Sequence, residues 1–116
     1  FLQLGHPICA AHERERLEKS GSYPSGHAAI GWGVALVLSE LVPGRAEAIL
    51  ARGLAYGQSR VVCGVHWPSD VEAGQRVAAA ALAATRRDPV YQAQFALAAR
   101  EIAASKLQPP PSAEAC

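Results

Sequence analysis

Two short segments of this sequence carry side chains that could do chemistry on an anion. The first covers residues 24–27 and ends on a histidine, and the second covers residues 59–70 and contains an arginine, a histidine and an aspartate. Histidine can attack an electrophile or transfer a proton near neutral pH. A guanidinium can bind two oxygens of one oxyanion. These residue types suit a reaction on an oxyanion held between the two segments.

The first segment has the features of a phosphate cradle at the start of a helix. Ser25 is a predicted N-cap, and the helix that follows presents unpaired backbone N–H groups and a partial positive charge. Gly26 lets the backbone approach a ligand closely. His27 could then donate a proton to a leaving oxygen. Taken alone, this segment is better explained as an ordinary N-cap followed by a partly exposed histidine.

The second segment pairs a nucleophile with a group that orients it. His66 and Asp70 are four residues apart, so on a helix they face the same side. A carboxylate bonded to one imidazole nitrogen fixes the tautomer and leaves the other nitrogen free to attack. Arg60 could bind two phosphate oxygens. The alternative, a buried histidine satisfied by a capping aspartate beside a surface arginine, stays open for this segment alone.

Together the two segments supply a nucleophile, its orienter, an acid and two kinds of oxyanion donor. This set is what phosphoryl transfer requires when no metal takes part. Pro24-Ser25-Gly26-His27 and the pattern Ser59-Arg60, five residues, His66, three residues, Asp70 resemble the second and third signature motifs of the type 2 phosphatidic acid phosphatase superfamily. Within it, the strings 21–27 and 57–74 resemble the bacterial class A non-specific acid phosphatases. The resemblance covers about residues 9–95.

The resemblance implies an all-helical domain that hydrolyses small-molecule phosphomonoesters without a metal or another cofactor. It implies a phosphohistidine intermediate on His66, protonation of the leaving group by His27, and support by Asp70. The residues that would hold phosphate are Ser25, Gly26 and Arg60. Relatives of this kind are usually periplasmic or secreted and often form homodimers.

One family feature is absent from the sequence. The first motif, a lysine followed after six residues by Arg-Pro, does not occur: Lys19 has no Arg-Pro after it. We expect the sequence, which opens on Phe1, to start just after that motif and to form the C-terminal part of a larger domain. Two phosphate-binding cations would then be missing. Two alternatives remain: a vanadium haloperoxidase-like oxidoreductase with vanadate in the same pocket, and a helical remnant without catalysis.

The elements that must position these residues are predicted to be helices. Apolar periodicity, Gly and Pro breaks and capping residues predict helices at about residues 11–19, 26–42, 45–59, 67–86 and 89–106. Residues 61–65 are apolar and β-branched, and we expect a buried connector there rather than a strand. The predicted fold is all-α, a compact bundle of about four to five helices. Residues 1–107 would form a single domain, followed by a Pro-rich tail at 108–116.

Composition excludes several classes of protein. Among 116 residues, Lys plus Arg number 11 and Asp plus Glu number 10, which argues against a nucleic-acid binder. No apolar run reaches the length of a membrane span, and residues 28–42 fit a core helix better. The cysteines have no zinc-site spacing. Cys9 and Cys63 could pair in an oxidising compartment or remain free thiols, and the sequence leaves both open.

Overall fold

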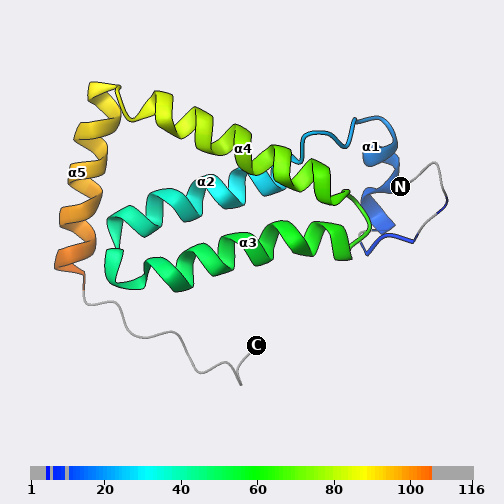
Figure 1. Ribbon diagram of the computed structural model, residues 1–116, viewed down its shortest axis with the longest axis horizontal. Coiled ribbons are helices and arrows are strands. Elements are labelled where there is room, and N and C mark those ends of the chain that lie inside the picture. Colours follow the sequence, from blue (N-terminus) through cyan, green and yellow to red (C-terminus); the bar gives the residue numbers. More distant parts are fainter. Residues whose placement is uncertain (1–4, 6, 10, 106–116) are drawn as a thin grey trace, which may run out of the picture.

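The computed structural model describes residue 5, residues 7–9 and residues 11–105. The described residues form helices and connections without a strand, so the predicted all-α class is confirmed (Figure 1). The elements in chain order are η2 Ala11–Glu13, α1 Arg14–Glu18, α2 Gly26–Leu41, η3 Pro43–Arg45, α3 Ala46–Val62, α4 Pro68–Thr85 and α5 Pro89–Ala104. The tail expected at 108–116 lies outside the described residues.

Capping side chains start the helices where the sequence predicts. The Ser25 side chain accepts a hydrogen bond from the Ala28 amide at 3.2 Å and caps α2. Asp88 caps α5 by accepting from the Val90 amide at 2.7 Å. Pro68 occupies the first turn of α4, where its missing N–H is not needed.

Helix α3 is longer than predicted. It continues through Val62, so Val61 and Val62 belong to the helix and not to a connector. The Cys63 amide donates to the Ser59 carbonyl at 2.9 Å and closes the last turn, and these helical hydrogen bonds override the β preference of two valines. Gly64, with φ of +73°, then turns the chain toward α4.

Helix α2 is the centre of the fold, because it packs against both α3 and α4, whereas α3 and α4 touch each other much less (Figure 1). Small residues allow the close approach. A Cβ added to Gly53 of α3 would lie 2.6 Å from the Ala35 Cβ, and a Cβ added to Gly74 of α4 would overlap the Ser25 carbonyl oxygen. The Ser25 amide also donates to the Asp70 carbonyl at 2.9 Å. These contacts bring residues 24–27 against the start of α4.

The core consists mainly of small side chains. The buried apolar residues are Ala28, Ala35, Cys63, Val71, Ala78 and Leu82. The expected core helix at 28–42 buries only Ala28 and Ala35, whereas Ile30, Val34 and Leu38, which share one face of α2, are exposed. Helix α5 lies across the end of the fold away from α1 and contacts α2 (Figure 1). It has no buried residue.

A disulfide joins Cys9 to Cys63, which resolves the pairing that the sequence left open. The Cys9 amide also donates to the Cys63 carbonyl at 3.0 Å. The bridge holds residues 7–9 against the turn that leads to His66. None of the described helices combines the length and apolarity needed to cross a membrane.

Candidate active site

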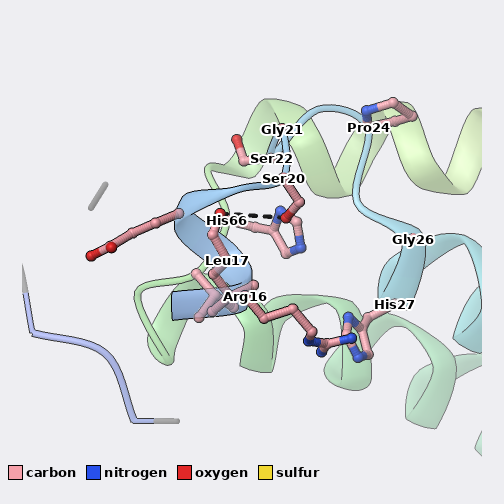
Figure 2. Close-up of a pocket in the computed structure, with 11 residues that line it drawn as sticks. Arg16, Leu17, Ser20, Gly21, Ser22, Pro24, Gly26, His27 and His66 are labelled. Carbon is pink, nitrogen blue, oxygen red and sulfur yellow. Dashed lines mark hydrogen bonds between the residues drawn. The ribbon is translucent and has the colours of Figure 1, made fainter. Parts of the chain in front are cut away.

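One cavity of about 700 Å³ lies where four segments meet (Figure 2). Its walls come from α1, the loop at 20–24, the first turn of α2 and the end of the α3–α4 turn. His27 and His66 both line it. The fold thus brings one histidine from each predicted segment to a single hollow.

His66 is buried and presents one particular nitrogen to the cavity. The residue is 7% exposed. Its Nδ1 atom is buried without a hydrogen-bond partner and lies 3.6 Å from Oδ2 of Asp70. Because Nδ1 faces the carboxylate, Nε2 is the ring nitrogen available to a ligand. This geometry fits the predicted pairing of His66 with Asp70, although the two side chains are slightly too far apart for a hydrogen bond.

Asp70 is 3% exposed and is held as an anion by other donors. Its Oδ2 accepts from the Trp67 amide at 2.9 Å and from the Ser22 hydroxyl at 2.8 Å. Burial would raise the pKa of Asp70, but these two hydrogen bonds and the nearby His66 outweigh it, so the pKa lies below its ordinary value. Asp70 therefore stays negatively charged beside the imidazole.

The environment of His66 favours its neutral form. Burial lowers the pKa of His66, while the Asp70 carboxylate opposes this effect in part. The charge of His27 also lowers the pKa of His66, so the two imidazoles lie within electrostatic range of each other. A neutral imidazole is the form that can attack an electrophile.

His27 is exposed in the first turn of α2, and it lines the cavity, as Arg16 of α1 does (Figure 2). The charge of His27 also acts on α1 and its neighbourhood: together with the Arg16 hydrogen bond and the Arg16 charge, which are the larger causes, it lowers the pKa of Glu13. His27 thus stands at an accessible wall of the cavity, where it can exchange protons with a bound molecule or with solvent.

Gly26 and Ser25 occupy different surroundings. Gly26 lines the cavity, and a Cβ added there would meet no protein atom within 4 Å, so open space lies above it. Ser25 is 0% exposed, and its hydroxyl is engaged as the N-cap of α2. Ser25 is not among the described residues that line the cavity. Its predicted contact with phosphate stays a prediction.

Arg60 does not line the cavity in the described part of the chain. Its Nε donates to the Ser59 hydroxyl at 3.2 Å, and its Cζ lies 5.6 Å from the centre of the Tyr56 ring. This is a cation–π arrangement. The predicted binding of phosphate by Arg60 stays a prediction.

Two cavity residues were missed by sequence reasoning. Ser22 contacts Asp70 across 48 positions of sequence, a long-range pairing that no local pattern announces. Arg16 lies in a short, densely charged helix of the kind expected on a solvated surface, yet it lines the cavity and pairs with Glu13 at 2.6 Å. The only available signal was that Ser22 belongs to the string 21–27 that resembles the phosphatases.

No cluster of three or more metal-ligating side chains occurs among the described residues. The polar groups at the cavity are instead imidazoles, a carboxylate, a guanidinium and hydroxyls. This set matches the chemistry of an oxyanion site built from side chains.

Residues 3–94 match the PAP2 superfamily, and the chain therefore belongs to that superfamily. The resemblance inferred from the two segments is confirmed. The chain is 49% identical over 102 residues to an acid phosphatase of Zymomonas mobilis. The matched region covers 88% of this chain and 39% of that protein. It is 48% identical over 106 residues to a non-specific acid phosphatase of Providencia stuartii, covering 91% and 43% respectively.

A non-specific acid phosphatase of Salmonella typhimurium is 45% identical over 102 residues, covering 88% of this chain and 41% of that protein. The chain thus spans about two fifths of the length of these curated relatives.

Proposed function

We propose that this chain carries the catalytic residues of an acid phosphatase that hydrolyses small phosphomonoesters through a phosphohistidine on His66. The observation that carries the proposal is the meeting of His27 and His66 at one cavity in a chain of the PAP2 superfamily. The names of the relatives support the reaction class.

In the proposed first step, Nε2 of neutral His66 attacks phosphorus, and the bond from phosphorus to the ester oxygen breaks. His27, in its protonated form, donates a proton to that departing oxygen, so that an alcohol leaves. Asp70 remains ionised and stabilises the positive charge that develops on the His66 ring. Burial lowers the pKa of His66, which favours the neutral form with an unprotonated attacking nitrogen.

In the proposed second step, water attacks the phosphohistidine. His27, now neutral, accepts a proton from the water, the bond from nitrogen to phosphorus breaks, and phosphate departs. Backbone N–H groups at the start of α2, together with a guanidinium, would stabilise the charge on the phosphoryl oxygens. No step requires a metal ion.

We also propose an oxidising compartment, the periplasm or the exterior of the cell, as the site of action. The Cys9–Cys63 disulfide supports this, since such bonds persist mainly in oxidising environments.

Hydrolysis of p-nitrophenyl phosphate in the presence of a chelator tests the function. We expect activity to be lost in His66→Ala and strongly reduced in His27→Ala. His12→Ala is the matched control, because the side chain of His12 is 83% exposed and does not line the cavity. Turnover that survives in His66→Ala, or that the chelator abolishes, would contradict the mechanism.

Trapping of the covalent intermediate gives a second test. Rapid quenching with a radiolabelled substrate should yield a phosphoprotein that is stable in alkali and labile in acid, with the label on His66. A label on serine, or none during active turnover, would exclude a phosphohistidine.

A further inference from the structure

A short segment near the start of the chain is fastened to the turn between α3 and α4. The Cys9–Cys63 disulfide joins the two, and the Cys9 amide donates to the Cys63 carbonyl at 3.0 Å. A Cβ added to Gly64 would lie 2.6 Å from the Pro7 carbonyl oxygen, so the two backbones are in close contact. A covalent bond, a hydrogen bond and a close backbone contact therefore hold residues 7–9 against this turn.

The two sides of the turn are held in different ways. On the side of α4, the Trp67 amide donates to the Asp70 carboxylate at 2.9 Å. On the side of α3, the Val65 amide returns a hydrogen bond to the last turn of that helix at 3.2 Å. The chain reaches Val65 through Gly64, and glycine has the widest backbone freedom of any residue. Contacts from outside the turn therefore decide how firmly its first half is held.

The position of this turn is also the position of one wall of the cavity. Val65 and His66 both line the cavity, and they follow Gly64 directly. A shift of the turn would move that wall and the His66 ring together. A misplacement of a reacting group by about 1 Å can cost about a hundredfold in rate. The support given by residues 7–9 is therefore of a kind that chemistry in the cavity can register.

We propose that the Cys9–Cys63 disulfide positions the turn that carries His66, so that the cavity is competent only in the oxidised chain. Reduction by a dithiol breaks the bond between the two sulfurs. Two hydrogen atoms pass from the dithiol to the cysteine sulfurs, and the dithiol closes to its own disulfide. Residues 7–9 then keep only their non-covalent contacts with the turn. The inference rests on the proposed function in one respect, namely that His66 is the nucleophile.

The effect of reduction is local because the main helix contacts do not involve residues 7–9. Helix α2 packs against α3 and α4 through the residues of those helices, and these contacts remain available in the reduced chain. Thiols persist in a reducing environment and disulfides in an oxidising one. The chain therefore holds His66 loosely in reducing surroundings and fixes the ring when the bond closes.

The test compares the oxidised and the reduced chain without substrate. NMR spectra of the histidine rings report on His66, assigned with a His66→Gln variant, and calorimetric titration with inorganic phosphate reports on the cavity. After reduction with dithiothreitol we expect the His66 ring signals to shift and broaden and phosphate binding to weaken, while amide exchange in α2 and α4 stays slow. In the active protein, kcat for p-nitrophenyl phosphate should fall about a hundredfold and return on reoxidation.

Two variants serve as controls. The Cys9→Ser, Cys63→Ser double variant should resemble the reduced chain and should not respond to dithiothreitol. Asp88→Ala removes the cap of α5, at the end of the fold away from α1, and so lowers stability without touching the turn. Its His66 ring signals should match those of the parent chain.

Unchanged His66 signals in a chain that thiol counting shows to be fully reduced would overturn the proposal, as would an equal change in Asp88→Ala. Unfolding of α2 and α4 on reduction, even in trimethylamine N-oxide, which favours the folded state, would also overturn it, because the bridge would then support the whole fold. The NMR comparison needs no turnover. A chain whose His66 ring responds to reduction but that hydrolyses no phosphomonoester would contradict the proposed function alone.

Discussion

The close approach of α2 to α4 can be tested by replacing glycine with alanine at two positions, Gly74 and Gly33. We expect the two substitutions to change the free energy of unfolding in opposite directions. A Cβ at Gly74 would overlap the Ser25 carbonyl oxygen and lie 3.1 Å from the Ala29 amide nitrogen. Both are backbone atoms, so no change of rotamer can relieve the overlap. Overpacking of this kind costs about 3 kcal/mol, and the better helix propensity of alanine returns about 1 kcal/mol. We expect Gly74→Ala to lower the free energy of unfolding by about 2 kcal/mol.

Gly33→Ala is the matched comparison. A Cβ there would lie 3.7 Å from the Ala78 Cβ, which is an ordinary van der Waals contact. We expect this change to raise the free energy of unfolding by about 0.5–1 kcal/mol. Urea denaturation of both variants, followed by circular dichroism, measures the two effects. If Gly74→Ala proved as stable as the parent chain, the close approach of α2 to α4 described here would be refuted.

Three further predictions concern pH, the disulfide and a helix cap. The pKa of His66 in the folded chain lies below its ordinary value of 6.5, so the unfolded chain binds this proton more readily. Stability should therefore fall as the pH drops below 6.5. The free energy of unfolding, measured as a function of pH, should change less steeply in His66→Gln. The disulfide joins residues 54 positions apart, and its reduction should lower the free energy of unfolding by about 4 kcal/mol. We expect a reductant to lower the Tm of the parent chain and to leave the Tm of the Cys9→Ser, Cys63→Ser double variant unchanged. Asp88→Ala should cost about 1 kcal/mol and speed amide exchange in the first turn of α5; exchange that stays as slow as in the parent chain would show that the cap contributes nothing.

Local signals in the sequence were sufficient to place most helices. Ser25 and Asp88 are capping residues followed by helical periodicity, and both cap helices in the structure. The connector predicted at 61–65 begins two residues later than expected, because hydrogen bonds to the preceding turn extend α3 through Val61 and Val62 despite their β-branched side chains. A single sequence does not show where helical hydrogen bonding outweighs the intrinsic preference of individual residues.

The candidate site was only partly predictable. The spacing of His66 and Asp70 was enough to place them together, and a recognisable motif pointed to His27. The directions of long side chains could not be predicted from the sequence. Arg60 lies over the Tyr56 ring and does not line the cavity. Arg16 lines the cavity although its short helix is densely charged, as is typical of a solvated surface. The hydrogen bond from Ser22 to Asp70 joins residues 48 positions apart in the sequence, and only coordinates reveal it.

Helix α5 is attached at the end of α4 opposite to the cavity (Figure 1). With 18 residues, α4 separates its two ends by about 27 Å. A fluorescent dye or an immobilising tether fixed to the exposed surface of α5 would therefore stay clear of ligands entering between the histidines. The molecule can be anchored by one extremity while the cavity at the other stays accessible.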